Sequence, residues 1–390
     1  MPPRRPSHRA AITQGRANPP QWATLYARVS GTVCQLRLSR IYAVRRARSP
    51  QPAPKMPKIA ADPYILPGGE RLMRIFMAVL RIGTRGSLLA KTQSRAVATA
   101  LMAANTGLTT ELVSITTTGD RTPDGSLQNA GGKGLFVKEL QQALREKAID
   151  IAVHSAKDLP TGQVDALIVA ATPTRADPHD VWIAHGGLKI ADLPPQSVVG
   201  TTSLRRQALL LSRRPDLRVV PLRGNIDTRL EKVRRGVVAG TFLAKAGLDR
   251  TGLMPHEAIT LPLDEFIPAA GQGTLALECR ESDAASIAIA RTIHDPVTAS
   301  ALAFERRVVE ALAGSCLAPI GVMARPRWLD HPGTPGWIVR AFVALPDASQ
   351  TARAALINEI SACDADIFNL LISTLNNRGA REIMAKLSLQ

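Results

Sequence analysis

A lysine and an aspartate stand side by side where a short apolar stretch of the chain ends. The stretch reads Asp150-Ile-Ala-Val-His-Ser-Ala-Lys-Asp-Leu-Pro160, and its proline cannot continue a strand. This pattern is typical of a parallel strand that delivers side chains to the mouth of an α/β cleft. Because an ion pair at such a mouth costs stability in many settings, Lys157 and Asp158 are predicted to do chemistry. His154, inside the apolar run, is interpreted as a satisfied core histidine.

Arginines gather at predicted strand ends and helix starts in the second half of the chain. They are Arg205 and Arg206 after Gly200-Thr-Thr-Ser203, Arg223 in Leu222-Arg-Gly-Asn225, Arg229 and Arg250. A guanidinium group binds a carboxylate through two parallel hydrogen bonds, and a helix N-terminus adds N–H donors. The cluster therefore predicts a ligand with several carboxylates or phosphates. The alternative is that these arginines are solvated helix charges paired with Asp216, Asp227 and Glu231.

Two glycine-containing loops carry further candidates. Ala130-Gly-Gly-Lys-Gly134 lacks the first glycine and the hydroxyl residue of a phosphate-binding loop, so it is interpreted as a flexible lid that brings Lys133 to an anion. Gly314-Ser-Cys-Leu-Ala-Pro319 exposes a cysteine on a short loop, which makes Cys316 a candidate for a reactive or modified thiol. Cys279 lies on an apolar run and is predicted to be an inert core residue. The cysteines and histidines show no metal-ligand spacing, so no metal site is expected.

From Val79 onward short apolar runs alternate with amphipathic segments, which predicts an α/β fold. Strands are expected at residues 79–83, 112–116, 151–154, 167–171, 197–200, 218–221, 241–244 and 337–344. A helix that ends at about 104 is expected after Ser87, its N-cap, and another from about 204, capped by Thr201-Thr-Ser203. Further helices are expected at 136–148, 225–235, 298–313 and 366–377. Residues 176–180 are interpreted as a linker, and residues 267–273 as a crossing back to the first unit. The predicted organisation is a disordered basic arm (1–76), domain 1 (77–175 with about 274–292), domain 2 (179–268) and domain 3 (296–390). Two lobes joined by short crossings favour a ligand cleft between them.

The formal net charge of +17 is concentrated at the N-terminus. Residues 1–61 hold twelve Lys and Arg and no Asp or Glu, which leaves +5 for residues 62–390 and argues against a nucleic-acid partner. No apolar run is long enough for a membrane-spanning helix, so no membrane partner is expected. The arm is explained either by translation that begins near Met73 or Met77, or by a targeting segment. The expected location is the cytoplasm, or an organellar stroma if the arm is a genuine transit peptide.

Seven collinear blocks, over about residues 80–386, resemble the porphobilinogen deaminase (hydroxymethylbilane synthase) family. They are Arg81-Ile-Gly-Thr-Arg-Gly-Ser87, Gly131-Gly-Lys-Gly-Leu-Phe-Val-Lys-Glu-Leu140, Asp150–Pro160, Gly200-Thr-Thr-Ser-Leu-Arg-Arg-Gln207, Leu222-Arg-Gly-Asn225, Ala270-Gly-Gln-Gly273 and Gly314-Ser-Cys316. The resemblance implies two lobes like those of periplasmic binding proteins and a smaller α+β C-terminal domain. It implies a monomeric transferase of tetrapyrrole, porphyrin and heme biosynthesis with a covalent dipyrromethane cofactor. Such an enzyme joins four porphobilinogen units with loss of ammonia and releases hydroxymethylbilane by hydrolysis.

The resemblance also implies roles for individual residues. Asp158 matches the catalytic aspartate, and Cys316 matches the cysteine that holds the cofactor by a thioether. The cofactor- and substrate-binding positions are Arg85, Lys157, Arg205, Arg206, Arg223, Arg229 and Arg250. Secondary contacts are expected from Ser87, Ser155, Thr201, Thr202, Ser203 and Asn225. Gln272 lies at a domain crossing, and Lys133 and Phe136 match the edge of the active-site loop.

Two other classes of protein account for part of the pattern. A non-catalytic two-lobed binder of small polycarboxylates explains the arginines but not Asp158 and Cys316 together. The hypothesis of a nucleic-acid-binding protein explains only the basic arm.

Overall fold

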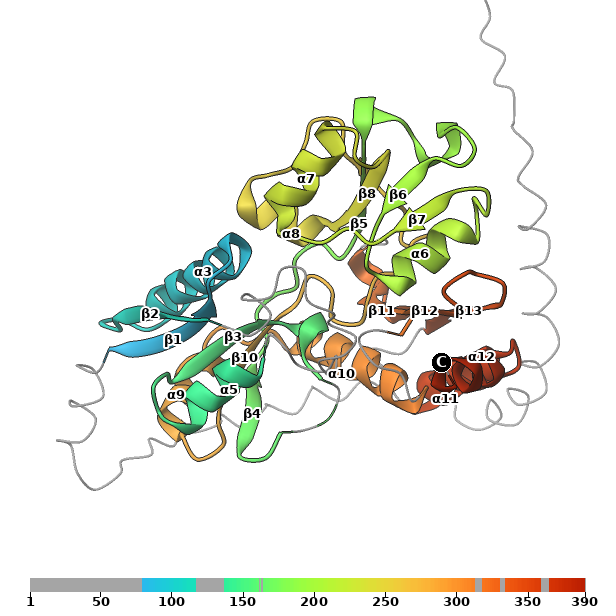
Figure 1. Ribbon diagram of the computed structural model, residues 1–390. Helices are drawn as coiled ribbons and strands as arrows, with labels where there is room; N and C mark the ends of the chain where they lie inside the picture. The colour runs from blue at the N-terminus through green and yellow to red at the C-terminus, as the bar shows by residue number, and fades with distance from the viewer. Residues whose placement is uncertain are drawn as a thin grey trace, which may run out of the picture. The chain divides into compact units, whose positions relative to one another are not determined.

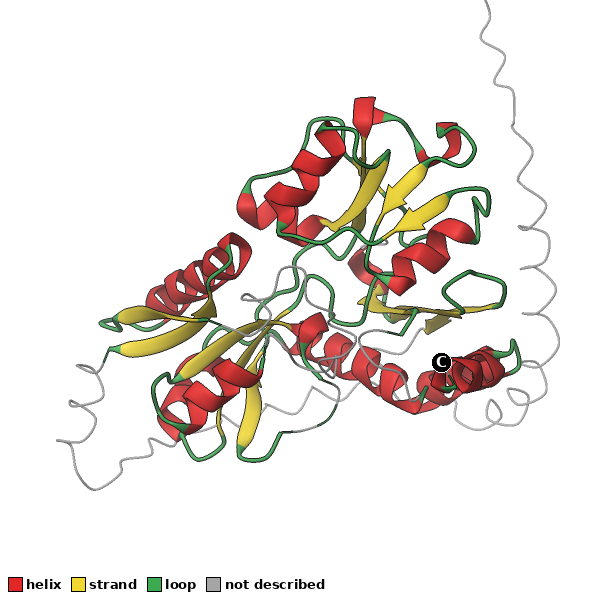
Figure 2. Cartoon of the chain, viewed as in Figure 1, coloured by secondary structure: helices red, strands yellow, loops and turns green. Residues whose placement is uncertain are grey.

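The computed structural model describes residues 79–116, 137–160, 162, 164–312, 318–329, 334–358 and 365–389. Within these residues the strands form three sheets, each accompanied by helices (Figures 1 and 2). None of the described helices combines the length and the apolar character that crossing a membrane requires. The predicted α/β class is confirmed.

The first sheet has five strands in the order β2-β1-β3-β10-β4. Its strands are β1 (Leu80–Arg85), β2 (Thr110–Ile115), β3 (Ile151–Ser155), β4 (Leu167–Ala171) and β10 (Leu275–Arg280). β1 runs parallel to β2 and β3, whereas β10 is antiparallel to β3 and β4. Its helices are α3 (Leu88–Ala104), α5 (Lys138–Arg145) and α9 (Ala284–Arg291). Ser87 caps α3 as predicted, because its hydroxyl accepts a hydrogen bond from the Ala90 amide at 3.3 Å.

The second sheet is also mixed, in the order β7-β6-β8-β5-β9. Its strands are β5 (Asp180–Ala184), β6 (Val198–Gly200), β7 (Arg218–Val220), β8 (Gly240–Ala244) and β9 (Ile259–Thr260), and its helices are α6 (Leu204–Leu211), α7 (Ile226–Arg234) and α8 (Lys245–Thr251). Trp182, Phe242 and Phe266 stack in its core, with ring centroids 5.0 and 5.6 Å apart. One prediction is wrong here, because Asp180 is the first residue of β5 and not the end of a linker. The apolar run Val181-Trp-Ile-Ala184 that follows it is a fully buried strand.

The third sheet is antiparallel and consists of β11 (Ile320–Pro326), β12 (Trp337–Ala344) and β13 (Thr351–Asn358). Helices α10 (Pro296–Ala311), α11 (Ala365–Asn376) and α12 (Ala380–Ser388) accompany it. Val308, Val322, Val339 and Leu371 lie in their common core, each with no exposed surface. α10 is important for the site because it also contacts the first sheet's β3 turn, described below.

The segment that returns from the second sheet to β10 makes two close approaches. At Gly273, with φ +87°, an added Cβ would collide with the Ala176 carbonyl oxygen. At Gly271, with φ +72°, it would lie 2.9 Å from Leu302 Cδ1 and 3.1 Å from Ala156 Cβ. Only glycine fits both the backbone conformation and the space. The motif Ala270-Gly-Gln-Gly273 is therefore the tight crossing that the sequence predicted.

Candidate active site

Asp158 ends a short 3-10 turn, Ala156–Asp158, that follows β3 directly. The Ala156 amide donates to the Thr274 carbonyl at 3.0 Å, and the Leu159 amide donates to the Ala156 carbonyl at 3.3 Å. The buried side chains of Ala156 and Leu159 anchor the turn in the core, whereas Asp158 is exposed. Within the described parts of the chain, the Asp158 carboxylate accepts no hydrogen bond and forms no ion pair. Such a carboxylate is available to a ligand.

Lys157 contacts Gln272 and not its neighbour Asp158. Its Nζ donates to Gln272 Oε1 at 3.5 Å, and no ion pair with Asp158 forms among the described residues. Burial lowers the pKa of Lys157 to about 8, and the nearby charges of Arg206 and Arg205 lower it further against the opposing effect of Asp158 and Asp180. Lys157 is therefore a cation without full compensation.

Arg205 and Arg206, at the start of α6, share one buried carboxylate. Arg205 Nη1 lies 2.8 Å from Asp180 Oδ2, and Arg206 Nη2 lies 2.7 Å from Asp180 Oδ1. Arg205 Nη1 also donates to the Ile267 carbonyl, and Arg206 Nη1 donates to the Phe242 carbonyl, each at 2.8 Å. Burial alone would raise the pKa of Asp180, but the two guanidinium charges outweigh it and hold the pKa far below its usual range. Two positive charges thus share one negative charge.

Gln272 connects the lysine to this carboxylate. Its Nε2 donates to Asp180 Oδ1 and to the Pro178 carbonyl, both at 2.8 Å, while its Oε1 accepts from Lys157. Gln272 has no exposed surface. The side chains Lys157, Gln272, Asp180, Arg205 and Arg206 therefore form one connected polar network across the crossing between the two five-stranded sheets.

Other predicted residues surround α6 and α7. Ser203 caps α6, where its hydroxyl accepts from the Arg206 amide at 3.4 Å, and Thr201 Oγ1 accepts from the Ser203 amide at 3.1 Å. Thr202 is exposed. Arg229 Nε donates to the Gly224 carbonyl at 2.8 Å, and burial lowers the pKa of Arg229 to about 10, with a further contribution from the charge of Arg206. Arg229 therefore lies near the arginine pair.

The remaining predicted residues lie at the margins of this network. Arg250 Nη2 donates to the Gly273 carbonyl at 2.8 Å, beside Gln272, and burial lowers the pKa of Arg250. Arg223 is half-buried, and Asn225 is an exposed N-cap residue of α7 whose side chain makes no capping bond. At the first sheet, Ser155 Oγ accepts from Gln93 Nε2 at 3.2 Å, Arg85 ends β1 and Ser87 starts α3.

Comparison with known proteins decides the family. A family model described as porphobilinogen deaminase, dipyromethane cofactor binding domain, matches residues 80–288. A porphobilinogen deaminase of Sorangium cellulosum is 43% identical over 275 residues, which are 70% of this chain and 90% of that protein. One of Desulforudis audaxviator is 41% identical over 305 residues, 78% of this chain and 96% of that protein. This chain belongs to the porphobilinogen deaminase family. Among solved structures, it matches the methionine binding protein MetQ with a TM-score of 0.36 and 14% identity, over 56% of this chain and 91% of that chain.

The family resemblance made three further site predictions, at Cys316, Lys133 and Phe136, that lie outside the described residues. Two predictions of ordinary core residues are confirmed. His154 Nε2 lies 3.0 Å from Glu278 Oε2, both side chains being buried. Cys279 has no exposed surface, and burial raises the pKa of its thiol to about 12.

The alternative, in which the clustered arginines pair with Asp216, Asp227 and Glu231, is not what the described residues show. Asp216 pairs with Arg214, and Glu231 pairs with Arg234 and Arg235. The carboxylate that Arg205 and Arg206 share is Asp180, which the sequence placed in a linker. The available signal was the position of Asp180 immediately before a buried apolar run, where an unpaired acid is costly.

Proposed function

We propose that this member of the porphobilinogen deaminase family condenses four porphobilinogen units head to tail onto a covalent dipyrromethane cofactor and releases hydroxymethylbilane by hydrolysis. The observation that carries the proposal is the exposed Asp158 carboxylate, without a described partner, beside the half-buried cation Lys157 and the buried cations Arg205 and Arg206. Porphobilinogen carries one acetate, one propionate and a pyrrole N–H. The site offers an acceptor for the N–H and several cations for the carboxylates.

The residues of the site fit a dipyrromethane group by the same chemistry. Asp158 is the acceptor for the pyrrole nitrogens, and Lys157, Arg205, Arg206 and Arg229 are the partners for the carboxylates. The lowered pKa values of Lys157 and Arg229, caused chiefly by burial, mark positive charges that an anionic ligand would stabilise. We propose Cys316 as the attachment point, because a thiolate forms a thioether with an electrophilic methylene carbon. Secondary contacts are proposed from Thr201, Thr202, Ser203 and Asn225 at the second sheet, and from Arg85, Ser87 and Ser155 at the first.

When bound, the cofactor supplies the electron-rich pyrrole carbon onto which the first substrate unit is joined. In each condensation the C–N bond of the protonated aminomethyl group would break with release of ammonia, and a C–C bond would form to a pyrrole α-carbon, which would lose its proton. The Asp158 carboxylate stabilises the positive charge that develops on the substrate as ammonia departs. It also accepts a hydrogen bond from the pyrrole N–H, which orients the ring. The fixed end of β3 gives this carboxylate its position before the substrate arrives.

The arginine pair is held in place by Asp180. Asp180 neutralises one of two guanidinium groups, so the pair keeps a net positive charge in surroundings that exclude water. Each added substrate unit brings two carboxylates, and these cations offset the accumulated negative charge. Gln272 hydrogen-bonds to both Lys157 and Asp180, so the Asp180 carboxylate also helps to fix the position of Lys157.

Intact-mass spectrometry combined with a porphobilinogen consumption assay tests the proposal. The native protein should exceed the mass of its chain by two pyrrole units, and Cys316→Ser should remove the excess mass and the turnover together. A native protein that binds porphobilinogen but shows neither added mass nor ammonia release would instead be a non-catalytic binder of small polycarboxylates.

The predicted setting of the enzyme is part of the proposal. We propose that it acts as a monomer, with domains at residues 77–175 with 274–292, 179–268 and 296–390. We place it in the cytoplasm, or in an organellar stroma if residues 1–76 are a targeting segment. Size-exclusion chromatography with light scattering tests the monomer, and N-terminal sequencing of the native protein tests the arm.

A further inference from the structure

Helix α10 contacts the turn that carries Asp158 and the residues just after it, through Leu302 and Arg306. Leu302 is buried in one cluster with Ala156 and Leu159, the residues on either side of Lys157 and Asp158. Arg306 follows Leu302 by one helical turn, so the two side chains share a face of α10. A helix that accompanies the third sheet therefore contacts the catalytic turn at two successive positions.

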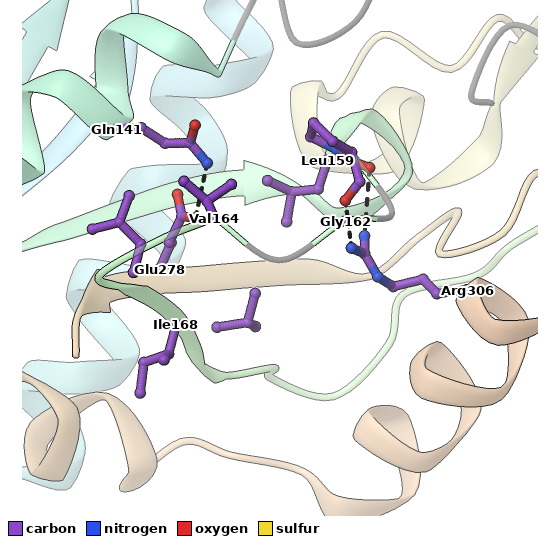
Figure 3. Close-up of a pocket in the computed structure, with 10 residues that line it drawn as sticks. Gln141, Leu159, Gly162, Val164, Ile168, Glu278 and Arg306 are labelled. Atoms are coloured by element: carbon purple, nitrogen blue, oxygen red, sulfur yellow. Dashed lines mark hydrogen bonds between the residues drawn. The ribbon is translucent and has the colours of Figure 1, made fainter. Parts of the chain in front are cut away.

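Arg306 holds the backbone immediately after Asp158. Its Nη1 donates to the Leu159 carbonyl at 3.4 Å, and its Nη2 donates to the Pro160 carbonyl. Figure 3 shows the guanidinium group directed at this segment. Both of these contacts are made to backbone carbonyl oxygens. They therefore constrain the path of the chain as it leaves the turn.

The upstream end of the turn is fixed separately. The Ala156 amide donates to the Thr274 carbonyl at 3.0 Å, and Lys157 donates to Gln272. Asp158 lies between these two anchors and has no described partner of its own, so its orientation follows from the backbone on both sides. Loss of the downstream anchor would move Asp158 more than Lys157.

We propose that Arg306 is a positioning residue that fixes the Asp158 carboxylate in its reactive orientation by clamping the carbonyls of Leu159 and Pro160. This inference rests on the proposed function. Because the arginines that bind carboxylates lie on other elements, removal of Arg306 should lower kcat and leave KM for porphobilinogen within about twofold. A displacement of a catalytic group by about 1 Å can reduce the rate about 100-fold. We therefore expect kcat of Arg306→Ala to fall by about 10- to 100-fold.

The matched control is the next residue of the same helix. Arg307 is exposed, and its guanidinium lies 3.8 Å from the ring centroid of Phe368, a residue of the third-sheet core. Arg307→Ala should keep kcat near the wild-type value even if its melting temperature falls. Equal losses of kcat in Arg306→Ala and Arg307→Ala would assign both arginines a purely structural role and overturn the proposal.

A cavity beside the clamp permits chemical rescue. The cavity has a volume of about 250 Å³, and its lining includes Leu159, Pro160, Val164, Glu278 and Arg306 (Figure 3). The buried Glu278 carboxylate at its wall favours a cation, and Arg306→Ala would open the space that the guanidinium group leaves. Millimolar guanidinium ion should raise the kcat of Arg306→Ala several-fold. It should leave the kcat of the wild type and of Arg307→Ala unchanged. The absence of rescue, together with a kcat of Arg306→Ala within twofold of the wild type, would refute the role.

Different results would contradict the proposed function and the positioning role of Arg306. An inactive wild-type protein without added mass would contradict the proposed function. An active wild type with an unaffected Arg306→Ala variant would contradict only the positioning role. If Arg306→Ala does not fold, Arg306→Lys supplies the test, because a lysine can reach one carbonyl but not both. It should show an intermediate kcat with an unchanged KM, and a wild-type kcat in this variant would overturn the clamp.

Discussion

The guanidinium group of Arg206 lies 2.7 Å from the carboxylate of Asp180, and neither side chain has more than 7% of its surface exposed. The same carboxylate receives Arg205 at 2.8 Å and Gln272 at 2.8 Å. A buried charge of this kind is stable only when its partners are complete. Asp180 is thus the fixed centre around which the proposed carboxylate-binding cations are arranged.

Asp180→Asn should destabilise the protein strongly. Removal of one partner from a buried ion pair costs about 3–5 kcal/mol, because the remaining charges are left without compensation. Urea denaturation of the variant should show a loss of this size in the free energy of unfolding. Asp216→Asn is the control, since Asp216 pairs with Arg214 at the surface and its loss should be much smaller. Equal effects of the two substitutions would show that the buried network does not hold the arginines.

Arg206→Leu should impair cofactor assembly or chain extension as well as stability. The substitution removes a proposed carboxylate partner and leaves Asp180 with Arg205 and Gln272 only. Intact-mass spectrometry should show a reduced fraction of protein with the two-pyrrole addition, or an accumulation of incompletely extended species. A variant with full cofactor content and normal product formation would contradict the binding role of Arg206.

Asp158→Ala should separate catalysis from folding. Its side chain is exposed and makes no described hydrogen bond, so the melting temperature should stay within a few degrees of that of the wild type. Loss of a preorganised charge-stabilising group typically costs about 100- to 1,000-fold in kcat. The cofactor should remain attached, as seen by intact mass, while hydroxymethylbilane formation is lost. Normal product formation by this variant would refute the assigned role.

Several strands and helix starts could be predicted from the sequence, because each is a local pattern. Residues 167–171 and 337–344 are strands with the predicted bounds, and Ser87 and Ser203 cap helices as expected. Hydrophobic periodicity and capping act over a few residues, so one segment contains the whole signal. The clustered arginines near α6 and α7 were also identifiable, from their positions at strand ends and helix starts.

The partners of those arginines could not be predicted in the same way. Asp180 precedes Arg205 and Arg206 by 25 and 26 residues, and Arg306 lies 146 residues after Pro160. Such contacts depend on how separate elements pack, which no local pattern records. The short polar segment 176–180 looked like a linker because its aspartates are typical of turns. Only the packed structure shows that Asp180 is a buried strand residue.

The pH dependence of cofactor assembly should report the charge of Lys157. Its pKa is lowered to about 8, mainly by burial, whereas a lysine in the unfolded chain titrates near 10.4. Between these pH values the unfolded chain binds one proton more than the folded chain, so the contribution of Lys157 to stability rises with pH. Carboxylate binding has the opposite dependence, because it needs the protonated amine. Incorporation of porphobilinogen into the cofactor-free protein should therefore slow as the pH rises through about 8.

Lys157→Arg should remove this dependence, since a guanidinium group stays charged. Lys245→Arg should leave it intact, because Lys245 pairs with Asp249 at 2.8 Å, a hydrogen bond that raises its pKa. Mass spectrometry of timed samples at several pH values would follow the incorporation, and an identical pH profile for the wild type and Lys157→Arg would exclude Lys157 as the titrating group.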